Sequence, residues 1–135
     1  MGSRSFVSED NPINWWPNLI EQLLKPLSDN RPARYRSYDW KLKKFTRWHD
    51  LKPTDFVILE GVSASRKVFK PYLSYSIWLE TPRHERLRRG LERDGETMRK
   101  QWEQWMSLED AYIRREHPEQ TADIVISGAA DVPLI

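Results

Sequence analysis

Apolar side chains recur at helical spacing near the start of the chain. Between Trp15 and Leu27 they return every three or four residues, which is typical of an amphipathic helix. Asn14 is suited to cap the first turn, and Pro17 is tolerated there because its N–H would have no partner within the helix. The apolar positions of this predicted helix are Trp16, Leu19, Ile20, Leu23, Leu24 and Leu27.

Three short apolar runs predict buried strands further along the chain. They are Phe56–Leu59, Ser76–Leu79 and Ala122–Ile126. Continuous apolar runs of this length are typical of strands that are buried on both faces, as in a parallel sheet. Residues 83–95 and 96–116 have helical patterns. Because strands then alternate with helices, the sequence favours an α/β fold with a parallel sheet.

Residues 31–52 are basic and aromatic without a clear period, and they predict short strand pieces joined by loops. Within them, Tyr38 and Asp39 follow Arg34 closely. Aromatic side chains beside a carboxylate can stack on a base and accept a hydrogen bond from a sugar hydroxyl. A hairpin whose aromatic side chains cover a sheet explains the same pattern, and the sequence leaves both interpretations open.

Two other sets of residues have chemistry suited to phosphates. Glu60 directly follows an apolar run, and ligands of open α/β sheets bind at the carboxyl ends of strands, so its carboxylate could hold magnesium. Arg86, Arg89 and Arg93 share one face of a predicted helix, where guanidinium groups could stabilise a transferring phosphoryl group. Taken alone, these patterns are explained more simply by a solvated turn and by a helix face paired with Glu85, Glu92 and Asp94.

Composition narrows the class of protein. The 135 residues have a formal net charge of +2, which gives only weak support to nucleic-acid binding. The absence of cysteine excludes a disulfide framework, a thiolate zinc site and a cysteine nucleophile, and it suits a reducing compartment. No apolar run approaches the ~20 residues of a membrane span, and no signal-peptide pattern is visible. We therefore expect a single cytoplasmic domain over residues 1–135, without membrane contact.

Several short motifs, in their order along the chain, resemble the uridine kinase-like branch of the P-loop kinases. The resemblance extends from about Phe6 to Gly128, and it rests on the ordered set because no single motif is decisive. The motifs are Asn11-Pro12 with Asn14-Trp15-Trp16-Pro17, Arg34-Tyr35 with Tyr38-Asp39-Trp40, Val57-Ile58-Leu59-Glu60-Gly61-Val62, Ser76-Ile77-Trp78-Leu79-Glu80-Thr81-Pro82, Arg86-Leu87 with Arg89 and Arg93-Asp94, and Ala122-Asp123-Ile124-Val125.

The resemblance implies a phosphotransferase that uses ATP and magnesium and acts on a nucleoside or another small hydroxyl compound. It also implies a three-layer fold of parallel strands flanked by helices, with a lid helix region at about residues 83–100. The implied site residues are Arg86, Arg89 and Arg93 as catalytic lid arginines, Glu60 at the magnesium ion through water, Glu60 and Asp123 on the cofactor side, and Tyr38, Asp39 and Arg34 at the substrate.

The chain departs from the family pattern in one respect. It contains no G-x-x-x-x-G-K-[ST] loop, because none of its five glycines precedes Lys-Ser or Lys-Thr at the required spacing. The first strand, which is central in that family, and the catalytic base would be missing as well. We therefore expect a partial fold, an inactive chain and self-association through unpaired strand edges. Two alternatives remain. One is a binding module in which the basic, aromatic stretch from Arg31 to Trp48 holds single-stranded nucleic acid, although the small net charge argues against nucleic acid as a partner. The other is a regulatory partner of an intact kinase.

Overall fold

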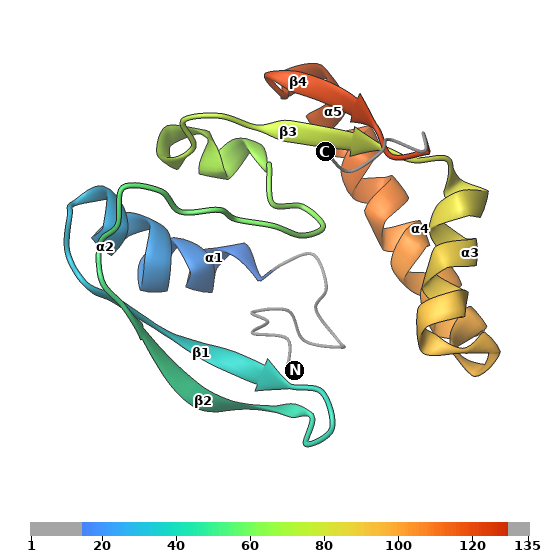
Figure 1. Ribbon diagram of the computed structural model, residues 1–135, viewed down its shortest axis with the longest axis horizontal. Helices are drawn as coiled ribbons and strands as arrows, with labels where there is room; N and C mark the ends of the chain where they lie inside the picture. Colours follow the sequence, from blue (N-terminus) through green and yellow to red (C-terminus); the bar gives the residue numbers. More distant parts are fainter. Residues whose placement is uncertain (1–14, 130–135) are drawn as a thin grey trace. The chain divides into compact units, whose positions relative to one another are not determined.

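A computed structural model describes residues 15–129, and the chain divides between Ala64 and Ser65 into two compact units (Figure 1). The described residues form a mixed α/β structure, with an antiparallel hairpin in the first unit and a small parallel sheet in the second. The mixed class and the parallel sheet confirm the expectation from the sequence. Asn14, the expected helix cap, lies outside the described residues.

The expected helix at the start of the first unit is confirmed. It consists of α1 (Trp16–Leu19), the π-helical turn η1 (Ile20–Leu24) and α2 (Lys25–Ser28). In a regular α-helix the ring of Pro26 would clash with the carbonyl group four residues earlier. Here the Lys25 N–H donates to the Ile20 carbonyl, five residues earlier, and this wider turn accommodates the proline.

Residues 31–52 form the hairpin that the sequence left open as one of two interpretations. β1 (Ala33–Asp39) and β2 (Lys44–Leu51) pair in antiparallel register, with an irregularity between Arg36 and Tyr38. The helical segment contacts β1 through η1. Burial alternates along the first part of β1, where Tyr35 is buried and Arg36 is exposed, so one face of the hairpin is directed to the core and the other to solvent.

The first of the three expected strands is absent. Residues 56–59 have no regular secondary structure, and Phe56 and Ile58 expose 88% and 91% of their surface. A buried strand needs partners for its backbone donors and acceptors, and no strand of the described residues pairs with this segment. The prediction of a buried strand over Phe56–Leu59 is therefore wrong.

The second unit contains the other two expected strands, paired in parallel as predicted. Ile77 lies opposite Ile124, and Glu80 lies opposite Ser127. The helices expected between these strands are also confirmed. In chain order the elements of this unit are η2 (Lys67–Tyr72), β3 (Ile77–Glu80), α3 (Arg83–Asp94), η3 (Glu96–Met98), α4 (Arg99–Glu116), α5 (Pro118–Thr121) and β4 (Ile124–Ser127).

Helices α3 and α4 lie side by side, joined by a tight connection (Figure 1). Gly95 ends α3 with a positive φ of 95°, and His117 ends α4 in the left-handed conformation with a φ of 48°. Gly90 is buried where the helices meet, since a Cβ atom there would lie only 2.6 Å from the Trp102 ring. The sequence therefore specifies both the ends of the two helices and their close approach.

The core of the second unit is formed by residues of η2 and α4 rather than by the strands. Phe69, Met106 and Tyr112 are almost fully buried. By contrast, Leu79 and Val125 expose 62% and 50% of their surface. The prediction that these strands are buried on both faces is therefore wrong for this chain, because the described residues do not cover the sheet as the layers of a larger α/β fold would.

Candidate functional site

The strands β3 and β4 end together at one edge of the small sheet, because parallel strands point the same way. The Gly128 N–H donates to the Glu80 carbonyl at 2.8 Å and closes this edge. Gly128 also approaches Thr81 closely, because a Cβ atom there would lie 2.1 Å from Thr81 Oγ1. Helix α3 begins at Arg83, directly after this turn. The carboxyl end of the sheet is therefore next to the first turns of α3.

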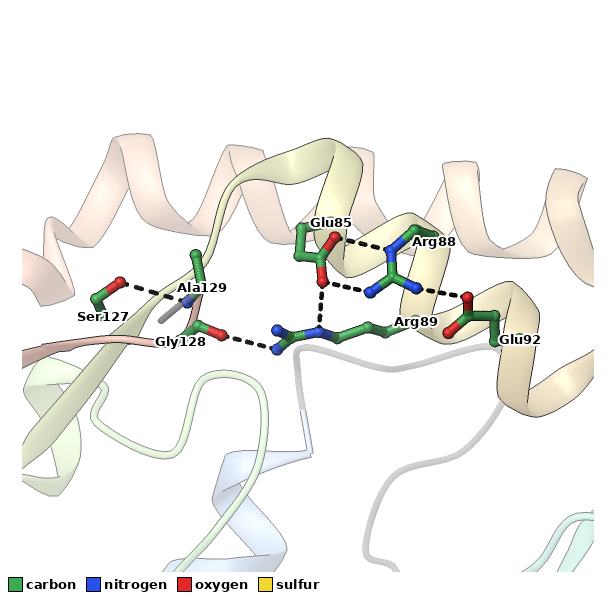
Figure 2. Close-up of polar contacts among 7 residues, drawn as sticks. All are labelled: Glu85, Arg88, Arg89, Glu92, Ser127, Gly128 and Ala129. Carbon is green, nitrogen blue, oxygen red and sulfur yellow. Dashed lines mark hydrogen bonds and ion pairs between the residues drawn. The ribbon is translucent and has the colours of Figure 1, made fainter. Parts of the chain in front are cut away.

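Arg89 connects α3 to this end of the sheet. Its Nη1 donates to the Gly128 carbonyl at 2.8 Å, and its Nε donates to Glu85 Oε1 at 2.8 Å (Figure 2). Glu85 also accepts two hydrogen bonds from Arg88, which pairs in addition with Glu92. These four charged residues form an ion-pair network along α3, and Arg89 is the member that reaches the carboxyl ends of the strands.

The network holds Glu85 in its ionised form. Hydrogen bonds from Arg88 first, and from Arg89 as well, lower the pKa of Glu85 to about 2. Glu85 lies in the first turn of α3, where the helix dipole also favours negative charge. At neutral pH the Arg89 guanidinium therefore faces a carboxylate, and an anionic ligand would have to take the place of that carboxylate.

The other two predicted arginines have different partners. Arg86 is half-buried and donates to Glu109 on α4, while burial raises the pKa of that carboxyl and the Arg86 charge opposes the rise. Arg93 pairs with Asp94 at 2.8 Å, and its guanidinium lies 5.6 Å from the centre of the Trp102 ring. The shared helical spacing is confirmed, but the two arginines pair with separate carboxylates. Arg93 has a partner that the simpler interpretation names, whereas Arg86 pairs with carboxylates of α4 instead.

Asp123 lies at the opposite end of the sheet from Arg89. It directly precedes β4, and its carboxylate accepts hydrogen bonds from the Ser76 N–H at 2.7 Å and the Ser76 hydroxyl at 2.8 Å. The bonds from Ser76 lower the pKa of Asp123 below its usual range. A pocket of about 420 Å³ adjoins it and is also lined by Arg66 and Lys70. The structure does not bring Asp123 and Arg89 together.

Glu60 lies in exposed irregular chain beside Gly61, whose φ is 139°. Within residues 15–129, no three acidic or histidine side chains form a group that could hold a metal ion. The sequence also lacks a glycine-rich phosphate loop. The described residues therefore do not fit magnesium and ATP by themselves, and the role of Glu60 stays a prediction.

The three expected substrate residues lie on the hairpin. Tyr38 is buried, with its ring edge-on to Trp40 and Phe45, each at 5.3 Å. Asp39 accepts hydrogen bonds at 2.9 Å from two backbone N–H groups of the turn that follows β1. Arg34 is exposed and pairs with a carboxylate on β2. Tyr38 and Asp39 therefore stabilise the hairpin, and contact of these three residues with a substrate stays a prediction.

Sequence reasoning named Glu85 and Glu92 as acidic partners of the arginine face but not the network that they form with Arg88. It placed Trp48 in a stretch that could stack on bases, but not beside Arg34 and Arg36. The spacing of Glu85, Arg88 and Glu92 on one helix carries the first signal, since residues three and four apart meet on a helix surface. Trp48 lies directly opposite Arg36 in the hairpin, and that pairing depends on a register with an irregularity. No local pattern predicts such a register, so the Trp48 contact required the structure.

Comparison with known proteins assigns no family to this geometry. Neither the models of protein families nor the curated proteins match the chain. Among the described helices, none combines the length and the apolar character needed to cross a bilayer. The function of the chain is therefore inferred from its own residues.

Proposed function

We propose that this chain is the lid-bearing part of a uridine kinase-like, ATP-dependent phosphotransferase that acts on a nucleoside or another small hydroxyl compound. The position of Arg89 carries the proposal. Arg89 lies on the helix that follows β3 and reaches Gly128 at the carboxyl end of the parallel strands. Ligands of open α/β sheets bind at this end, and a guanidinium group binds phosphate oxygens through two parallel hydrogen bonds.

A polyphosphate that binds Arg89 would replace the Glu85 carboxylate as the anionic partner of its guanidinium group. Exposed ion pairs stabilise proteins little because water and salt screen them, so replacing Glu85 as the partner of Arg89 costs little. Arg88 would keep Glu85 paired after Arg89 leaves it, because Arg88 makes two hydrogen bonds of its own to that carboxylate. Arg86 would contribute indirectly, because its hydrogen bond to Glu109 holds α3, the helix that carries Arg89, against α4.

Phosphate transfer would also need a phosphate-binding loop, which the sequence of residues 1–135 does not contain. In this proposal another segment or another polypeptide supplies it, because backbone N–H groups, a lysine and a magnesium-binding hydroxyl have no substitute among the described residues. The roles of Glu60, Tyr38, Asp39 and Arg34, which lie in the first unit, and of Asp123, which lies at the other end of the sheet, stay predictions. The chain alone is expected not to transfer phosphate.

Titration with inorganic tripolyphosphate, followed by NMR, tests the lid. We expect the side-chain Nε–Hε signal of Arg89 and the backbone amide of Gly128 to shift together and to saturate at millimolar ligand. Arg89→Lys keeps the charge but loses the guanidinium fork together with its Nε–Hε signal, so the shift of the Gly128 amide should shrink. Arg99→Lys is the matched control, because Arg99 is an exposed arginine that also pairs with a glutamate of its own helical region.

Calorimetry with MgATP on the unmodified chain completes the test. No micromolar binding is expected, because the phosphate loop is missing. Equal shifts at Arg89 and Arg99 would indicate attraction by charge alone and would contradict the proposed lid. Micromolar binding of MgATP would overturn the inference that the site needs a loop from elsewhere.

A further inference from the structure

The hairpin segment has a charge opposite to that of the rest of the chain. Residues 31–52 contain eight lysines and arginines and two acidic residues, a formal charge of +6. Because the whole chain has a net charge of +2, the remaining residues together have a charge of −4. All eight basic residues of the hairpin segment are exposed. The small net charge therefore conceals a strongly basic surface.

An exposed tryptophan lies within this basic surface. Trp48 on β2 lies opposite Arg36 on β1 and exposes 45% of its surface. The guanidinium groups of Arg34 and Arg36 lie 5.0 Å and 5.7 Å from the centre of its ring. Arg34 is held further by an ion pair with Asp50 at 3.3 Å. The indole ring and the two guanidinium groups therefore form one cation–π cluster, which we name the Trp48 stack.

Basic side chains continue from the Trp48 stack toward the turn. Within residues 15–129, no carboxylate forms an ion pair with Arg36, Arg47 or Lys44. At a rise of ~3.4 Å per residue, the distance along β1 from Arg34 to the turn is about 17 Å. Exposed positive charge therefore extends along the hairpin from the Trp48 stack to the turn.

We infer that this face of the hairpin binds single-stranded nucleic acid. A base would stack on the Trp48 stack, and the basic side chains would hold the phosphates. Aromatic and arginine planes both stack on unpaired bases, and a basic track binds the backbone without sequence preference. An anionic membrane fits less well, because the neighbours of Trp48 on this face are Arg34, Arg36 and Asp50 rather than apolar side chains that could enter a bilayer.

Fluorescence anisotropy of a short labelled oligodeoxythymidine, measured on the full chain at several salt concentrations, tests the inference. The logarithm of the binding constant should fall with the logarithm of salt concentration, with a slope of about −0.7 for each phosphate contacted. Trp48→Leu should weaken binding about tenfold, whereas Trp48→Phe, which keeps a ring, should weaken it less. Arg36→Ala should reduce the slope by about one contact. Lys100→Ala removes an exposed charge outside the hairpin and should change neither quantity.

Three results would overturn the inference. One is the absence of binding at low salt with the folded wild-type chain. Another is unchanged affinity in both Trp48 variants, which would show attraction by charge without stacking. A third is binding to vesicles that contain phosphatidylserine but not to the oligonucleotide, which would assign the surface to membranes. Circular dichroism confirms that each variant is folded, and Trp48→Phe keeps the test decisive if Trp48→Leu fails to fold. The proposed kinase lid is tested separately, since tripolyphosphate is directed at Arg89.

Discussion

Replacing Gly90 with alanine tests the packing of α3 against α4. The indole ring of Trp102 lies directly over the buried Gly90. A Cβ atom at this position would lie 2.6, 2.8 and 2.9 Å from ring atoms Cε2, Cζ2 and Cδ2. The ring is restrained, because its Nε1 donates to Asp94 at 3.0 Å and Arg93 lies over its face. The clash therefore cannot be relieved by the ring alone.

Two effects of opposite sign decide the outcome for Gly90→Ala. Alanine is more favourable than glycine in a helix interior by ~1 kcal/mol. Carbon atoms prefer separations of ~3.5–4.0 Å, so all three contacts are far too short, and overpacking of this kind costs ~1–3 kcal/mol. Because three ring atoms are involved, we take the upper end of that range. The free energy of unfolding should then fall by about 2 kcal/mol.

The same substitution in a Trp102→Leu background is the control. Without the indole ring only the helix propensity remains, so Gly90→Ala should then stabilise by about 1 kcal/mol. Urea unfolding of the four chains, followed by far-ultraviolet circular dichroism, measures this reversal of sign as a coupling energy of about 3 kcal/mol. Stabilisation in both backgrounds would refute the ring contact. Equal destabilisation in both would place the strain elsewhere in α3.

Two further predictions concern charged groups of the second unit. Glu116→Gln removes the negative charge that pairs with Arg66, and the two side chains expose only 15% and 6% of their surface. The free energy of unfolding should fall by about 2 kcal/mol, less than the ~3–5 kcal/mol lost when a fully buried pair is broken. An unchanged urea midpoint would contradict this. The pKa values of Glu85 and Asp123 in the folded chain lie below their ordinary values of 4.5 and 3.8. The two ionised carboxylates therefore stabilise the fold fully at a pH above these ordinary values. This stabilisation is lost as the pH falls through the pKa of the folded chain, which is about 2 for Glu85. Stability should therefore decline on acidification below about pH 4.5, with a smaller decline in the Glu85→Gln, Asp123→Asn double variant. A Glu85 carboxyl signal that titrates near 4.5 by NMR would count against the network.

The helices of the second unit could be predicted from the sequence because their signals are local. The spacing of apolar residues predicts α3 and α4, and Gly95 ends α3 through a positive φ that favours glycine. Pro118 predicts the end of α4, since the residue before a proline avoids the helical conformation, and His117 is indeed left-handed. The ends of these helices are therefore determined by a few neighbouring residues, which the sequence shows directly.

Strands and partners of side chains were predicted less well, because they depend on distant residues. Phe56–Leu59 and the residues of β3 look alike as apolar runs, yet only β3 pairs with another strand. Likewise, the shared face of Arg86 and Arg89 follows from helical spacing, whereas their contacts with α4 and with Gly128 depend on tertiary structure. The candidate site was therefore predicted by residue type, and its geometry was not.

The exposed sheet connects these observations to the proposed function. Within the described residues, β3 pairs only with β4, so its other edge is open, and parallel sheets of this apolar character are normally covered on both faces. A strand added in parallel at the open edge of β3 would end beside Glu80, because parallel neighbours point the same way. The loop that follows such a strand would then meet the first turns of α3, where Arg89 reaches the carboxyl end of the sheet. The open edge of β3 and the missing phosphate loop thus have one common explanation in the proposal: a strand with its loop supplied from elsewhere would pair that edge and bring the loop to Arg89.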